Sequence, residues 1–312
     1  MKRFNGIALS VAFCSLASQA ALAQTKIDTL KVQNLNEVIV KGVRAAKEAP
    51  YAVANIRKSE LKQFSCSGQE LPFLLSRTPG ILAWSENGIG TGTTYMRIRG
   101  AAGSRINVTL DGVALNSPED QTVFWANMNS YSSLLGSIQV QRGVGSSTNG
   151  DGAFGGSISM ATAAPSLTPT AEVTGSFGSY NTYHTGASFS TGLLGKHLIF
   201  DGAYHETATD GYVDGTEGRS GSYYGGLTWL SDNFKVSYKN IGNFEKTGQA
   251  WNGVLGGDYN SNFSLLQDGI RTYKDMYKAG LDKFNVLTGD MVRNDKGDYT
   301  ITPYTLRDGS KW

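Results

Sequence analysis

The stretch that decides the fold lies between Tyr95 and Thr162. It contains the segments 95-YMRIRGAAGSRINVTLDGV-113 and 138-IQVQRGVGSSTNGDGAFGGSISMAT-162. Apolar and polar residues alternate within both segments, and glycine-rich turns separate the alternating runs, which is typical of short β-strands. Arg99 and Arg142 stand at the ends of two of these runs. We predict four strands here, at 96–98, 106–110, 138–140 and 158–160.

The residues around this stretch complete a domain of mixed structure. A β-prone run at 52–56 predicts a first strand. Ser67 with Glu70 three residues later predicts a capping box, and the leucines within 71–75 predict the short helix that follows. A second short helix is expected at 129–135. Together these elements predict an α+β domain over residues 49–165, with a mixed four-stranded sheet and short helices.

The N-terminus has the composition of a secretory signal. Lys2 and Arg3 precede a short apolar run, and small residues at Ala21 and Ala23 supply a cleavage site. We expect cleavage after Ala23, so that residues 1–23 are a signal peptide; a retained anchor is the alternative.

The cysteine content argues against a disulfide framework. Cleavage of the signal removes Cys14 and leaves Cys66 as the single thiol, so no internal disulfide is expected. We expect Cys66 to be a small, partly buried side chain, with a reactive thiol as the alternative.

Composition bounds the class of protein. The formal net charge is +2 and no basic tract occurs, so nothing indicates a nucleic-acid surface. The chain has 39 glycines and 11% aromatic residues, which favour turns and strands over long helices. No apolar run after the signal is long enough for a helical membrane span. These limits leave a soluble domain, a β-barrel, or both.

Beyond Pro165 the sequence alternates with a period of two. Around Val173, Phe200 and Val236, apolar and aromatic residues occupy one face and polar residues the other. Short links alternate with longer ones, which is typical of transmembrane β-barrel strands; an ordinary β-sandwich is the alternative. We predict antiparallel barrel strands over residues 166–312.

Residues 24–48 form a polar arm that includes one β-prone run. The run is Leu35, Asn36, Glu37, Val38, Ile39 and Val40. An extended segment near a terminus can add a strand to the sheet of another protein. The alternative is an edge strand of the domain that follows.

Several stretches of the chain resemble TonB-dependent outer-membrane receptors. The stretches are LPFLLSRTPGI, MRIRG, NVTLDGV, the segment 138–162 and NFEKTGQAWNGV. The resemblance implies that the α+β domain is a plug inside a membrane barrel. It also implies that Leu35–Val40 is the TonB box, which pairs with the periplasmic domain of TonB. Arg99 and Arg142 are then plug latches that pair with barrel glutamates, whose usual positions lie beyond Trp312; the alternative is that both arginines are solvated at the ends of turns.

The resemblance also implies a ligand at the outer face and a longer barrel. Two plug loops, 85–93 and 115–127, should point outward, with Glu86, Asn87, Phe124 and Trp125 as candidate ligand contacts; packing against barrel residues is the alternative for the aromatic side chains. Receptors of this family close about 22 strands. Only 147 residues follow Pro165, so we expect the chain to be the N-terminal part of a receptor with an incomplete barrel.

Three classes of function remain to be compared. The first is a transporter at the outer membrane, in contact with its lipid, with a ferric siderophore as the favoured ligand; cobalamin, haem or an oligosaccharide stay open. The second is an enzyme, which is poorly supported because the three histidines, His184, His197 and His205, have no companions at metal-ligand or triad spacing. The third is a secreted adhesive or signalling module. No cofactor, resident metal or nucleic-acid partner is expected.

Overall fold

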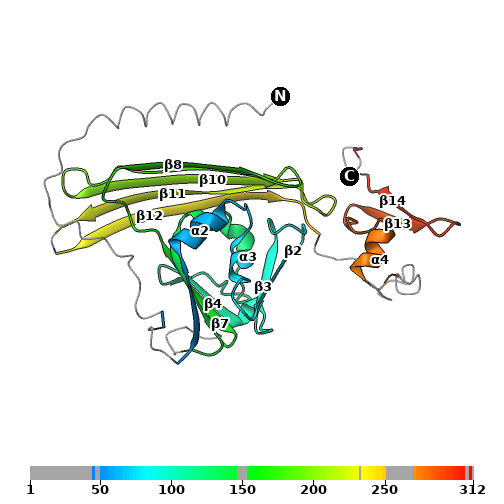
Figure 1. Cartoon of the computed structure of the whole chain (residues 1–312), viewed down its shortest axis with the longest axis horizontal. Coiled ribbons are helices and arrows are strands. Elements are labelled where there is room, and N and C mark those ends of the chain that lie inside the picture. Colours follow the sequence, from blue (N-terminus) through cyan, green and yellow to red (C-terminus); the bar gives the residue numbers. More distant parts are fainter. Residues whose placement is uncertain are drawn as a thin grey trace.

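The computed structural model describes residues 44–45, 50–145, 153–231, 233–250, 270, 272–305 and 309–310. The described residues between 50 and 162 form an α+β domain, here called the plug, and the next strands form a long antiparallel sheet above it (Figure 1). The predicted signal peptide and the predicted TonB box lie outside the described residues. No helix in the described part of the chain is long and apolar enough to cross a membrane.

The plug is built on a mixed sheet with the strand order β1-β6-β7-β4-β5. Its strands are β1 (Ala52–Arg57), β4 (Ile106–Leu110), β5 (Val113–Ala114), β6 (Leu135–Arg142) and β7 (Gly156–Thr162). β4 runs parallel to β7, and the other neighbours are antiparallel. The α+β fold with a mixed sheet is therefore confirmed, with five strands where four were expected.

One of the four predicted strands belongs to a different sheet. β3 (Thr94–Ile98) pairs with β2 (Ile81–Ser85) in a separate antiparallel hairpin. The two strands are joined by a short loop, so they find each other locally. The fourth long strand of the mixed sheet is instead β1, which pairs with β6 over its whole length.

The helices of the plug differ in detail from the prediction. α3 (Leu71–Leu75) lies where the leucine pattern predicted it, but its N-cap is Glu70 and no side-chain cap bond forms, so the predicted capping box is wrong. α2 (Lys58–Ser65) was not predicted. The plug also contains short 3-10 helices, which are η1 (Gly103–Arg105), η2 (Trp125–Met128) and η3 (Tyr131–Ser133). Cys66 ends α2 and is exposed, so its expected partial burial is wrong.

The core of the plug lies between this sheet and its helices. Alternate strand residues such as Ile138, Val140, Ile158 and Met160 point into it and are almost fully buried. Phe64 and the leucines of α2 and α3 cover them from the helix side. Tyr224 and Ile241 of the long sheet also pack against this cluster, so the plug and the long sheet share apolar contacts.

The long sheet has the strand order β12-β11-β10-β9-β8 and is antiparallel throughout. Its strands are β8 (Thr170–Phe177), β9 (Tyr183–Ser190), β10 (Leu198–Thr209), β11 (Gly218–Leu230) and β12 (Lys235–Thr247). Within the described residues these strands form an open sheet and not a closed barrel.

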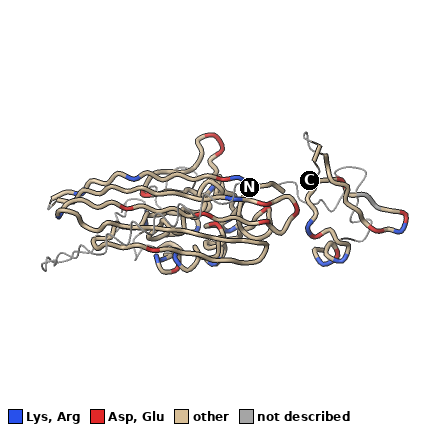
Figure 2. Tube along the Cα trace, turned by 90° about the horizontal axis from the view of Figure 1, so that it is seen from above, with Lys and Arg blue, Asp and Glu red and all other residues tan. Residues whose placement is uncertain are grey.

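The predicted alternation of the long sheet is confirmed. Val173, Phe200, Tyr223, Trp229 and Val236 are exposed on its outer face. Its inner face carries polar residues such as Ser222 and His184, which are buried. The helices α2 and α3 lie beneath this inner face (Figure 1). Few of the residues along the long strands are charged (Figure 2).

A small unit follows the long sheet. It contains α4 (Tyr273–Lys278) and a hairpin of β13 (Gly289–Arg293) and β14 (Tyr299–Pro303). It has its own small core around Leu281 and Phe284. Thr272 and Asp275 form a capping box at the start of α4.

Candidate functional site

The two predicted latch arginines lie close together on the plug. Arg142 donates from Nη1 to the carbonyl of Pro79 at 2.7 Å, and its Nε is buried without a partner. The guanidinium of Arg99 lies beside Gly143, the residue after Arg142. Arg99 has a φ of +51° and donates its backbone N–H to the carbonyl of Gly80 at 2.7 Å. Neither arginine forms an ion pair with a described residue.

A different ion pair joins the plug to the long sheet. Lys239 of β12 contacts Asp111, in the turn between β4 and β5, with Nζ 2.8 Å from Oδ2. Thr162 donates its backbone N–H and its hydroxyl to the same carboxylate, both at 2.9 Å. Burial alone would raise the pKa of Asp111, but the bonds from Lys239 and Thr162 outweigh it and hold this pKa below its usual value.

This ion pair was missed by sequence reasoning, which did not single out Asp111 or Lys239. The signal available in the sequence was the lysine on the polar face of a predicted strand. A lysine at the lumen side of a membrane strand needs a partner or water.

We expect Lys239→Met to weaken the attachment of the plug to the long sheet by about 1 kcal/mol. The estimate is modest because both side chains are almost one third exposed, where solvent screens the pair. Thermal unfolding of the full chain in detergent micelles measures the change. Lys246→Met, on the exposed position of the same strand, is the matched control. Equal losses in the two variants would contradict a specific role for the pair.

A buried carboxyl group lies at the same interface. Glu70 is 3% exposed, and its Oε2 accepts a hydrogen bond of 2.6 Å from the hydroxyl of Thr94. Its Oε1 is buried without a partner, as is Oε1 of Glu245 on β12. Burial raises the pKa of Glu70 to about 8, and the nearby Glu245 contributes to the rise. The folded chain therefore favours a neutral Glu70 near pH 7.

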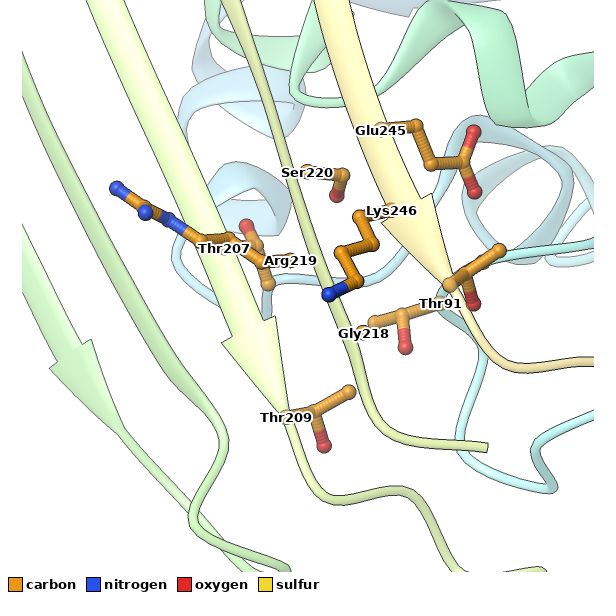
Figure 3. A pocket seen from close by; sticks show the side chains of 10 residues that line it. Thr91, Thr207, Thr209, Gly218, Arg219, Ser220, Glu245 and Lys246 are labelled. Atoms are coloured by element: carbon orange, nitrogen blue, oxygen red, sulfur yellow. The ribbon is translucent and has the colours of Figure 1, made fainter. Parts of the chain in front are cut away.

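A cavity of about 10 Å³ lies where the plug loop meets the ends of β10 to β12. Thr91 and Gly92 line it from the plug, and Thr207, Thr209 and Glu245 line it from the sheet (Figure 3). This volume fits about one water molecule. The cavity is too small for any ligand larger than a water molecule.

An aromatic pair on β2 and β3 flanks the loop 85–93 that was predicted to point outward. Trp84 and Tyr95 stack with ring centroids 5.4 Å apart, and both are 39% exposed. The guanidinium of Arg97 lies 5.9 Å from the centroid of the Trp84 ring. Glu86 accepts a hydrogen bond of 2.6 Å from the hydroxyl of Tyr95 and another from the backbone N–H of Ala250. Burial and the adjacent Glu86 raise the pKa of Tyr95 to about 12.

The other predicted contacts are divided between surface and core. Phe124 is 61% exposed, whereas Trp125 is 5% exposed and packs in the plug core. Asn87 is buried, and its side chain holds its own loop by bonds to Thr91 and Ile89. The structure thus brings Glu86 together with Trp84, Tyr95 and Arg97, which sequence reasoning did not single out.

Two of the three histidines form a buried pair on the inner face of the long sheet. His184 and His205 stack with ring centroids 5.7 Å apart. His184 binds Thr207 through Nδ1 at 2.9 Å. No group of three or more metal-ligating side chains occurs among the described residues. His197 lies apart and stacks on Trp229.

Comparison with known proteins defines the class of the plug. Residues 45–157 match the model of the TonB-dependent Receptor Plug Domain. This part of the chain is therefore a TonB-dependent receptor plug, followed by antiparallel strands. A search of curated proteins finds no match to this chain.

Several solved structures of receptors and transporters share the fold. FpvA of P. aeruginosa, in complex with iron and a heterologous pyoverdine, has 19% identity and a TM-score of 0.53, over 65% of this chain and 26% of FpvA. The copper transporter OprC has 14% identity and a TM-score of 0.51, over 67% of this chain and 32% of OprC. The ferric yersiniabactin uptake receptor FyuA of Yersinia pestis has 17% identity and a TM-score of 0.50, over 65% of this chain and 33% of FyuA. The chain thus spans about a quarter to a third of these receptors.

Proposed function

We propose that the chain acts in a TonB-dependent outer-membrane receptor that actively takes up a scarce ligand. The observation that carries this proposal is the arrangement of the long sheet over the plug. The sheet turns its polar face to the plug and leaves its aromatic face exposed. A membrane barrel wall needs this arrangement, because its outer face meets lipid and its inner face meets a polar lumen.

The proposed organisation has four parts. Residues 1–23 are the cleaved signal, 24–48 the periplasmic arm, 49–165 the plug and 166–312 barrel strands. The export signal supports placement in the outer membrane. Within the arm, Leu35–Val40 is the TonB box, which binds TonB by adding a strand to its sheet.

Arg99 and Arg142 are proposed as latch residues for carboxylates of the receptor. An arginine inside a closed barrel needs a paired acceptor, because an unpaired buried charge is costly. The unpartnered Nε of Arg142 supports this role. A cavity of about 260 Å³ beside Arg142, also lined by Arg77 and Glu60, leaves room for such an acceptor.

We propose a ferric siderophore as the ligand. The receptors of similar fold include proteins solved with pyoverdine and one named for ferric yersiniabactin. The Trp84–Tyr95 stack with Arg97 suits a ligand that has aromatic rings and negative charge. Copper, cobalamin, haem and oligosaccharides are the alternatives. The proposed function includes no covalent chemistry.

Cell fractionation and cross-linking test this function. We expect the chain in detergent-extracted outer membrane, and a cysteine at Val38 should form a disulfide with a cysteine variant of the TonB periplasmic domain. Ferric pyoverdine and ferric yersiniabactin serve as ligand probes, with Trp84→Ala expected to weaken binding of an accepted probe about tenfold. Recovery of the chain in the culture supernatant would instead support a secreted adhesive or signalling module.

A further inference from the structure

The base of the N-terminal arm is attached to the centre of the plug sheet. Arg44 and Ala45 are described, and they follow the proposed TonB box by only a few residues. They lie against β6 and β7, two adjacent inner strands of the sheet. We refer to Arg44 and Ala45 with their partners Ser137, Gln139 and Ser159 as the clasp.

The guanidinium of Arg44 bridges the two inner strands. It donates from Nη1 to Ser137 Oγ at 3.0 Å and from Nε to Ser159 Oγ at 3.2 Å. Its Nη2 donates to the carbonyl oxygens of the same two serines, at 3.3 and 3.0 Å. Hydrogen bonds from a charged donor are stronger than neutral ones, and the planar fork of arginine fixes their geometry.

The side chain of Gln139 holds the backbone of Ala45 at two points. The N–H of Ala45 donates to Gln139 Oε1 at 2.7 Å, and Gln139 Nε2 donates to the carbonyl of Ala45 at 3.3 Å. The same Nε2 lies 3.0 Å from Asn55 Oδ1 on β1. The amide of Gln139 therefore takes the place of a neighbouring strand for one residue of the arm.

The alternation of the two inner strands explains why these partners face the arm. Ile138, Val140, Ile158 and Met160 point into the core, so Ser137, Gln139 and Ser159 point to the opposite face. Gln139 and Ser159 are nevertheless buried. Buried polar side chains need hydrogen-bond partners, and Arg44 and Ala45 supply them.

We propose that the clasp is the first attachment that a pull on the arm must break, and that it directs the load onto β6 and β7 before β1. This inference rests on the proposed function, because it assumes that TonB pulls at Leu35–Val40. Without the clasp the load enters at the outer strand β1, which can peel from β6 one residue pair at a time. With the clasp, the six hydrogen bonds of Arg44 and Ala45 resist together.

Hydrogen exchange of the full chain in detergent micelles tests the clasp without TonB. We expect the amide of Ala45 to be protected in the wild type and to exchange about tenfold faster in Arg44→Ala, as expected for the loss of charge-assisted bonds. Arg44→Lys should lie between them, because lysine keeps the charge but loses the fork. Arg105→Ala, at an exposed arginine of the plug, is the matched control and should exchange as the wild type does. Equal exchange in the wild type and Arg44→Ala would overturn the proposal.

Pulling on the arm tests the mechanical role. A handle is attached at Val38→Cys in a mature chain that also carries Cys66→Ser. The wild-type background should show an early rupture that Arg44→Ala lacks, while the later unfolding of the plug is unchanged. An early rupture that survives in Arg44→Ala would overturn the proposal. Absence of a disulfide between the Val38 cysteine and TonB, with a normal clasp, would overturn only the proposed function.

Discussion

Replacing Val38 with proline should reduce energised uptake to the level of cells that lack TonB, while ligand binding at the outer face stays intact. Proline has no backbone N–H, so it removes a hydrogen bond from the strand that the TonB box is proposed to add to TonB. Its ring also clashes with the backbone of a neighbouring strand. The substitution is made at the chromosomal gene, and uptake and binding of radiolabelled ferric siderophores are measured in the same cells.

Val38→Ala is the matched control for this experiment. It shortens the side chain as well but keeps the N–H, so it should retain most of the uptake, because main-chain bonds carry most of the affinity in strand addition. Normal uptake in Val38→Pro would show that Leu35–Val40 is not the segment through which TonB acts.

The second large effect concerns Glu70, whose replacement by glutamine should remove the loss of plug stability that ionisation of this side chain causes as the pH rises. The pKa of Glu70 is raised to about 8 in the folded chain, chiefly because the side chain is buried. The unfolded chain ionises this group near pH 4.5, so between these values the folded state binds more protons than the unfolded state. Stability contributed by this group is therefore complete below about pH 4.5 and falls as the pH rises to about 8.

Across this range the free energy of unfolding of the wild type should fall by a few kcal/mol. Each pH unit contributes about 1.4 kcal/mol while Glu70 is protonated in the folded chain and ionised in the unfolded chain. Glu70→Gln is neutral at every pH, so its free energy of unfolding should fall less than that of the wild type as the pH rises. Thermal unfolding of the full chain in detergent micelles between pH 5 and pH 9 measures both curves.

Two further variants show whether the effect belongs to this site. Glu119→Gln changes an exposed carboxylate and should leave the fall of stability with rising pH as it is in the wild type. Glu245→Gln should make stability fall less steeply with rising pH, because the negative charge of Glu245 opposes ionisation of Glu70 across the interface. A wild-type chain that is equally stable at pH 5 and pH 8.5 would contradict a costly buried carboxyl group at position 70.

Local patterns in the sequence determined the elements of this protein. Alternation with a period of two predicted β4, β6, β7 and the strands of the long sheet, because a strand with one buried face imposes that period on its side chains. The leucines of α3 marked its helix, and the glycine-rich turns between runs marked the strand ends. The missed helix α2 (Lys58–Ser65) has Leu61 and Phe64 as buried apolar residues and is otherwise largely polar, so its apolar stripe is too short to stand out.

Contacts between distant residues were decided only by the tertiary structure. Lys239 and Asp111 are 128 positions apart, and Arg44 and Ser159 are 115 apart, so no local period relates them. Glu70 has the composition of an ordinary helix start, and only the folded chain, which places Thr94 and Glu245 beside it, makes it a buried acid. A periodic pattern shows which face of an element is buried, but the identity of the neighbour on that face depends on how the elements pack. The plug and its strands follow from local physics, whereas the interface between them follows from the packed fold.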